Sequence, residues 1–111
     1  MLGIWLDADE VVCVSLGYVE VRATIARRFR PGVAARVRRL LDDRWQQVQT
    51  IPVDDLLVDL AAQIAESHRL RALDAVHLAA ATEVKTDDLV FATWDNELAR
   101  AAQGSGFAVV P

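Results

Sequence analysis

The chain has 111 residues, the length of one compact domain, with 53% hydrophobic residues, 25% charged residues and a net charge of −4. This composition excludes a disordered chain, and no apolar run approaches the roughly 18–20 residues of a membrane span. A lone cysteine, Cys13, excludes an internal disulfide framework, and the first residues lack the basic region of a secretion signal. We therefore expect one cytoplasmic domain over residues 1–111, with no membrane segment.

Charge is unevenly distributed along the chain. Residues 1–50 carry eight basic and six acidic side chains, whereas residues 51–111 carry four basic and ten acidic ones. Seven arginines and no acid lie between Arg22 and Arg39. Such a block suits contact with nucleic-acid phosphates, and the plainer interpretation is a solvated helix face. The candidate nucleic-acid-binding residues are Arg22, Arg27 and Arg28.

The first half of the chain predicts two strands that flank two helices. The β-branched run at residues 10–14 predicts a buried strand, and Ser15 is placed to cap the next helix. Helices are expected over residues 16–29 and 33–47, separated by the break at Pro31-Gly32. The second helix has an apolar stripe, made of Val37, Leu40, Leu41 and Trp45. Residues 48–53 predict a short strand, and Pro52 suits an edge position.

The second half predicts three helices and two strands. A helix starts at Asp54 or Asp55 and runs to about residue 67, with five side chains facing inward: Leu56, Leu57, Leu60, Ala61 and Ile64. A buried, alanine-rich helix over 73–84, a strand over 89–92, a helix over 96–103 and a strand over 107–110 follow. Strands separated by one or two helices predict an α/β sandwich with a mostly parallel sheet.

Three carboxylates are expected where ligand sites form in such sheets, beyond the carboxyl ends of the strands. Glu20 lies one turn into the first helix, Asp74 in the first turn of the alanine-rich helix, and Asp95 just after the strand at 89–92. Grouped carboxylates are commonly held by Mg²⁺ or Mn²⁺, which activates water for phosphodiester hydrolysis. The carboxylates therefore indicate a metal-dependent nuclease site.

Each carboxylate also has a purely structural interpretation. Asp74 suits a helix N-terminus because of the helix dipole, and Asp95 suits an N-cap. Glu20 suits an exposed position at the margin of a helix stripe. Two neighbours are weaker candidates: His77 is one turn from Asp74 but fits a packed core position, and Cys13 fits an inert core thiol.

Three segments resemble PIN domains, most closely the VapC-type ribonuclease toxins. They are residues 15–22 (SLGYVEVR), residues 73–81 (LDAVHLAAA) and residues 89–99 (LVFATWDNELA), and the resemblance extends from about residue 9 to residue 111. It implies an α/β/α sandwich in which acids bind Mg²⁺ or Mn²⁺ and cleave RNA, a cognate antitoxin that blocks the site, and dimerisation. By this resemblance Glu20, Asp74 and Asp95 are metal ligands and catalytic residues, supported by Ser15 and Thr93.

The N-terminus departs from the PIN pattern, in which a central strand ending in an acid comes first. Residues 2–7 have a suitable composition, but two residues separate Asp7 from the strand at 10–14. A parallel crossover needs roughly a dozen residues, so this connection permits only a hairpin. We therefore expect residues 1–8 to be the end of a helix, and an N-terminally truncated fold that lacks the first strand and its acid.

The truncation has two expected consequences. The sheet would have a vacant edge, covered by a partner chain, a swapped segment or a homodimer interface. The metal site would keep three of four acids, so metal binding and catalysis would be impaired.

Three functions remain open at this point. The first is a VapC-like, metal-dependent endoribonuclease. The second is a degenerate PIN domain that does not cleave and instead binds an antitoxin, RNA or a second copy of itself. The third is a plain α/β binding domain whose acids are structural.

Overall fold

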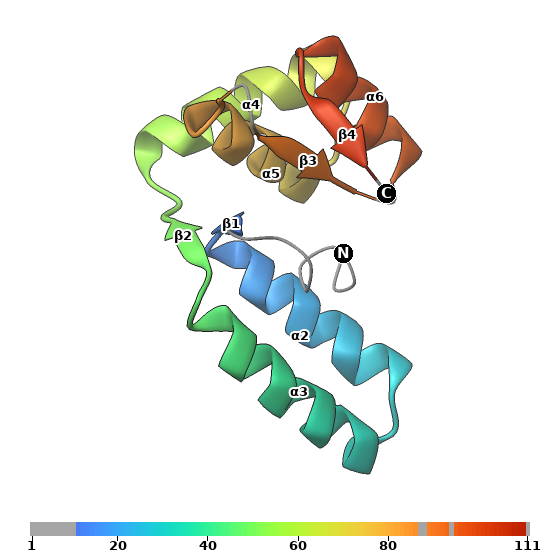
Figure 1. Ribbon diagram of the computed structural model, residues 1–111. Helices are drawn as coiled ribbons and strands as arrows, with labels where there is room; N and C mark the ends of the chain where they lie inside the picture. The colour runs from blue at the N-terminus through green and yellow to red at the C-terminus, as the bar shows by residue number, and fades with distance from the viewer. Residues whose placement is uncertain (1–10, 87–88, 94, 111) are drawn as a thin grey trace. The chain divides into compact units, whose positions relative to one another are not determined.

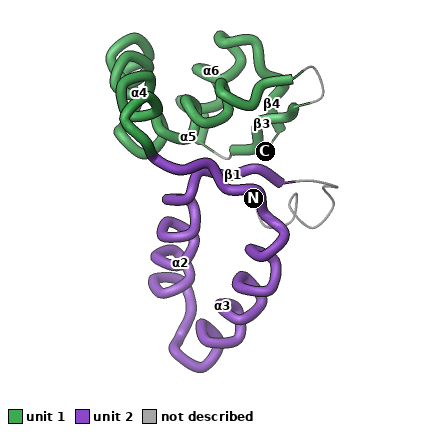
Figure 2. Tube along the Cα trace, turned by 90° about the vertical axis from the view of Figure 1, so that its left-hand side faces the viewer, with its two compact units in different colours: residues 1–9, 54–111 green, residues 10–53 purple. Residues whose placement is uncertain are grey.

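The computed structural model describes residues 11–86, 89–93 and 95–110, which form two compact units. One unit extends to residue 53, and the other begins at residue 54 (Figure 2). The prediction of a single domain stays a prediction. Asp7 and the rest of residues 1–8, predicted to end a helix, lie outside the described residues.

The unit that ends at residue 53 is a parallel strand pair joined by a helical hairpin. It contains β1 (Val12–Val14), α2 (Leu16–Arg28), α3 (Pro31–Trp45) and β2 (Gln49–Ile51). β1 and β2 pair in parallel, and the two helices that lie side by side in Figure 1 provide the long crossover that parallel strands require. Its buried apolar side chains are Val14, Ile25, Leu41 and Ile51.

Three local predictions for this unit are wrong. The Ser15 backbone is helical and its side chain makes no capping hydrogen bond; its N–H instead donates to the Ile51 oxygen at 2.9 Å. Pro31 starts α3, because a first helical residue needs no N–H partner. Leu40 is 56% exposed while Leu41 is 3% exposed, so the buried stripe of α3 is narrower than predicted.

The second unit contains α4 (Asp55–His68), α5 (Ala72–Glu83), β3 (Val90–Ala92), α6 (Asn96–Gly104) and β4 (Ala108–Val110). β3 and β4 pair in parallel, and α6 is the crossover between them (Figure 1). α4 packs against α5. The prediction that α5 is buried is confirmed by four of its side chains: Ala75, Leu78, Ala79 and Ala80.

The start of α4 differs from its predicted orientation. Asp54 caps the helix by accepting a hydrogen bond from the Leu57 N–H at 2.8 Å, so α4 begins at Asp55, one of the two predicted starts. Leu57 is fully buried, but Leu56, which we predicted to face inward, is 79% exposed. Successive helical residues differ by about 100° in direction, so the packing of Leu57 turns the first residue of the predicted stripe outward.

The described strands form two two-stranded sheets where a single sheet was predicted. Their parallel pairing and the mixed α/β class are confirmed. In the PIN pattern a further strand lies in the middle of the sheet, and the described residues contain no strand that joins the two pairs. Within the same residues, no helix is long and apolar enough to cross a membrane.

A glycine turn leads from α6 into β4. Gly106 has φ +88°, a backbone conformation that side chains with a Cβ rarely adopt. The Lys85 Nζ donates to the Ser105 carbonyl oxygen at 2.8 Å and lies 4.6 Å from the centre of the Phe107 ring. A Cβ on Gly106 would lie 2.8 Å from that Nζ, so the end of the Lys85 side chain occupies the space beside the glycine.

We predict that Gly106→Ala lowers the free energy of unfolding by about 1 kcal/mol, because alanine is disfavoured at this positive φ. Urea denaturation followed by circular dichroism measures the change. Gly104→Ala is the matched control, since Gly104 ends α6 and a Cβ added there would have nothing within 4 Å. Equal stability of the Gly106→Ala protein and the wild type would contradict the prediction.

The Cys13 thiol on β1 is held in its neutral form. Burial, and to a smaller extent the negative charge of Glu20, raises its pKa to about 11 from a usual value of 9.0. The folded protein therefore retains this proton at a pH where the unfolded chain loses it. The raised pKa therefore contributes to the free energy of unfolding. This contribution is fully present below about pH 9 and is lost as the pH rises toward 11.

We predict that iodoacetamide alkylates Cys13 slowly at pH 8 and that the rate rises steeply only toward pH 11, because the thiolate is the reactive species. Mass spectrometry across a pH series measures the rate. The urea-unfolded chain serves as the control and should react with the pH dependence of an ordinary thiol. Fast labelling of the folded protein at pH 8 would contradict the assigned pKa.

A candidate metal centre at the starts of α5 and α6

A tight turn between α4 and α5 fixes the position of Asp74. Arg69 ends α4 in the left-handed conformation, with φ 53°, and the Leu70 N–H donates to the Ala65 oxygen at 3.1 Å. Arg71 is the N-cap residue of α5, and Asp74 lies in the first turn of that helix. The helix dipole favours a carboxylate at this place, so the position of Asp74 agrees with the structural role predicted for it at a helix N-terminus.

Asp95 begins α6 directly after β3. Its Oδ1 accepts a hydrogen bond from the Leu98 N–H at 2.9 Å, which confirms the predicted N-cap. The Thr93 Oγ1 accepts a hydrogen bond from the Asp95 N–H at 3.1 Å, and the Thr93 N–H donates to the Val110 oxygen. Thr93 therefore ties Asp95 to the end of the β3–β4 pair, and its supporting role in a metal site stays a prediction.

One guanidinium connects the two carboxylates. The Nε of Arg71 lies 4.0 Å from the Oδ2 of Asp74, and its Nη2 lies 3.7 Å from the Oδ2 of Asp95. The structure thus brings Asp74 and Asp95 together around a single cation. Sequence reasoning missed Arg71, although a basic residue three positions before an acid at a helix start is a recognisable ion-pair spacing.

The two carboxylates fit a divalent ion. Mg²⁺ prefers oxygen ligands and is commonly held by one or two protein carboxylates together with water and substrate phosphates. Asp74 and Asp95 are such donors, and both already share a cation. Within the part of the chain that the structure describes, no three histidine, cysteine or acidic side chains form a metal-binding group. His77 is half-buried in α5, one turn after Asp74.

Glu20 belongs to the other unit, on α2, and its side chain is half-buried. Its carboxylate acts on Cys13, where it contributes to the raised pKa of the thiol. Its participation in a site with Asp74 and Asp95 stays a prediction. The supporting role of Ser15, whose side chain is exposed, also stays a prediction.

The arginine block lies on the α2–α3 hairpin, and all seven of its arginines are exposed: Arg22, Arg27, Arg28, Arg30, Arg36, Arg38 and Arg39. Arg22 lies 5.6 Å from the centre of the Tyr18 ring, whose hydroxyl donates to Asp42. That hydrogen bond is the main cause of the raised pKa of Tyr18. Arg27 and Arg28 occupy the last turn of α2, where the helix dipole favours positive charge.

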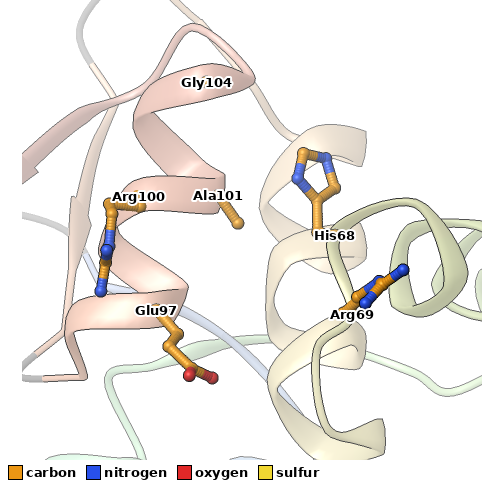
Figure 3. Close-up of a pocket in the computed structure, with 6 residues that line it drawn as sticks. All are labelled: His68, Arg69, Glu97, Arg100, Ala101 and Gly104. Atoms are coloured by element: carbon orange, nitrogen blue, oxygen red, sulfur yellow. The ribbon is translucent and has the colours of Figure 1, made fainter.

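An open hollow of about 380 Å³ lies between the end of α4 and α6 (Figure 3). His68 and Arg69 stand on one side, with Glu97 and Ala101 on the other, and Arg100 and Gly104 complete its lining. The lining carries both signs of charge and includes none of the predicted site residues. The hollow is therefore separate from the carboxylate pair.

Comparison with known proteins identifies the family. The model of the family described as "PIN domain" matches residues 2–104. The chain is 34% identical to "Ribonuclease VapC47" of Mycobacterium tuberculosis (strain CDC 1551 / Oshkosh), with 93% of this chain and 76% of that protein aligned. It is 33% identical to "Ribonuclease VapC45" of the same strain and to "Ribonuclease VapC49" of strain ATCC 25618 / H37Rv, with 97% of this chain and 78% of each relative aligned.

No solved structure matches the chain significantly. The family match nevertheless spans most of the chain, and it includes both carboxylates that share Arg71. The matched relatives agree with it over nearly the same residues. The chain therefore belongs to the PIN domain family, and its similarity is to VapC-type ribonucleases.

Proposed function

We propose that the protein is a metal-dependent endoribonuclease, in which Glu20, Asp74 and Asp95 hold Mg²⁺ or Mn²⁺. The observation that carries this proposal is the pair of carboxylates, Asp74 and Asp95, gathered around one cation at the starts of α5 and α6. The relatives named as ribonucleases support RNA as the substrate class. The oxygen donors support a hard divalent ion as the cofactor.

The bound ion would activate water and neutralise charge that develops on the phosphoryl oxygens. The contribution of this chain is to orient the ligands. The N-cap bond to Leu98 and the contact with Thr93 fix Asp95, while the first turn of α5 fixes Asp74. Because the Asp95 Oδ1 is engaged by α6, its Oδ2 is the atom directed to a shared cation.

We predict that Asp74→Asn and Asp95→Asn each reduce Mn²⁺-dependent cleavage of single-stranded RNA by about 100-fold or more, because a neutral amide oxygen binds a divalent cation more weakly than a carboxylate does. Asparagine still caps a helix, so Asp95→Asn should retain the stability of the wild type. Cleavage of a fluorescently labelled RNA and thermal unfolding measure the two effects.

Asp54→Asn is the matched control, because Asp54 caps α4 through the same bond that Asp95 makes in α6, at 2.8 Å and 2.9 Å respectively. It should leave cleavage unchanged. Metal-dependent cleavage that survives both Asp74→Asn and Asp95→Asn would contradict the assigned roles.

We also propose that the arginine block on α2 and α3 contacts the RNA backbone. Arg27 and Arg28 are exposed. Removing a positive side chain that contacts a phosphate lowers the affinity for RNA and makes that affinity depend less steeply on salt concentration. We predict that the double variant Arg27→Gln, Arg28→Gln binds single-stranded RNA about 10-fold more weakly in EDTA, with a salt slope smaller by about one or more. Fluorescence anisotropy across a salt series measures both quantities.

The double variant Arg69→Gln, Arg100→Gln is the control for net charge, since these arginines lie outside the block. It should change the affinity less than the variant within the block. An equal loss in the two double variants would show that RNA binding depends on total charge and not on the α2–α3 surface.

The proposed partners, besides RNA, are a cognate antitoxin that blocks the metal site and a second copy of the chain. An observation supports self-association: in the two two-stranded sheets of the described residues every strand has an unpaired edge, and such edges pair readily with another chain. The alternative function is a PIN domain that binds these partners without cleaving. Retained RNA binding without any metal-dependent cleavage by the wild type would favour that alternative.

A further inference from the structure

We propose that Arg71 is a built-in counter-ion that competes with the divalent metal for Asp74 and Asp95, so that the metal enters as the guanidinium leaves. This inference rests on the proposed metal site. Its basis is the position of one guanidinium near the Oδ2 atoms of both carboxylates, at 4.0 Å and 3.7 Å.

The backbone of Arg71 is held in place. Its carbonyl oxygen accepts the first hydrogen bond of α5, from the Ala75 N–H at 3.0 Å, and its extended backbone conformation is that of an N-cap residue. The buried Leu70 and the left-handed Arg69 fix the turn before it. Release of the carboxylates therefore needs only side-chain rotation.

Helix capping does not account for an arginine at this position. The Arg71 side chain makes no capping hydrogen bond, and a positive charge at a helix N-terminus is opposed by the helix dipole. The described interactions of its guanidinium are with the two carboxylates. The geometry therefore assigns Arg71 the role of offsetting the negative charge of Asp74 and Asp95.

The guanidinium is held weakly enough to be displaced. Its side chain is 82% exposed, against 23% for Asp74 and 35% for Asp95. Both contacts are longer than the roughly 2.7–2.9 Å of a hydrogen-bonded ion pair. Exposed ion pairs contribute little to stability and are screened by salt, so a metal ion can replace this one at small cost.

Charge explains why the two cations exclude each other. The two carboxylates near the guanidinium repel each other, and the guanidinium carries one positive charge whereas a divalent ion carries two. A divalent ion held by Asp74 and Asp95 would neutralise both charges, and it would compete with the guanidinium for the same two carboxylates. Arg71 therefore lowers the apparent metal affinity and reduces repulsion between the acids when no metal is bound.

The test compares the Mn²⁺ affinity of the intact wild-type chain with that of Arg71→Gln, by isothermal titration calorimetry and by electron paramagnetic resonance of free Mn²⁺. We expect Arg71→Gln to bind Mn²⁺ about three- to tenfold more tightly, the size of effect that weak exposed ion pairs imply. Arg71→Lys keeps the charge and should give an intermediate affinity. The difference between wild type and Arg71→Gln should shrink at high salt.

Arg69→Gln is the matched control. It removes the same charge two residues away, from an exposed side chain that lines the separate hollow, and it should change the Mn²⁺ affinity less than about twofold. Equal affinities for Arg71→Gln and Arg69→Gln would overturn the proposal, because the effect would then be one of net charge. Weaker Mn²⁺ binding by Arg71→Gln would also overturn it.

A second readout follows the guanidinium itself. In nuclear magnetic resonance spectra, titration with Mg²⁺ should shift the Arg71 Nε–H resonance of the wild type, and Asp74→Asn with Asp95→Asn should remove that shift. No shift on Mg²⁺ saturation would overturn the counter-ion role alone. Unchanged Mn²⁺ affinity in Asp74→Asn and Asp95→Asn would instead overturn the proposed metal site, so the two failures are distinguishable.

Discussion

The candidate site in the unit that begins at residue 54 depends on the balance of charge between one cation, Arg71, and two carboxylates, those of Asp74 and Asp95. Carboxylates near one another repel, and a cation or hydrogen-bond donors reduce that repulsion. The Leu98 N–H compensates part of the charge of Asp95, and Arg71 approaches both acids. The short turn after α4 and the crossover from β3 to α6 are the backbone features that place these three side chains at one end of the unit.

The structural and catalytic interpretations of Asp95 describe different atoms of one carboxylate. Its Oδ1 caps α6, as the corresponding oxygen of Asp54 caps α4, and its Oδ2 approaches Arg71. Asp54 has the same capping bond, and among the described residues it belongs to no carboxylate pair with a shared cation. An N-cap aspartate therefore becomes a candidate ligand only through its neighbours, here Asp74 and the Thr93 hydroxyl that fixes its backbone.

Periodicity and caps predicted the helices and strands well because these depend on short-range patterns. The burial of α5, the start of α4 and the cap at Asp95 follow directly from such patterns. The errors arose where tertiary packing decides, since Leu40 and Leu56 are apolar but exposed. Arg71 was missed because its role comes from Asp95, twenty-four residues away, and no local pattern records that contact.

The exposure of Arg71 is what makes a counter-ion compatible with a metal site. A buried arginine in a close, hydrogen-bonded pair would cost several kcal/mol to separate and would keep the metal out. An exposed guanidinium at 3.7–4.0 Å stabilises the acids by about 1 kcal/mol or less and leaves without unfolding its helix. Weak ion pairs are usually dismissed as unimportant for stability. At the proposed metal site that weakness would have a consequence, because it would allow the same two carboxylates to be balanced without metal and to accept metal when it is present.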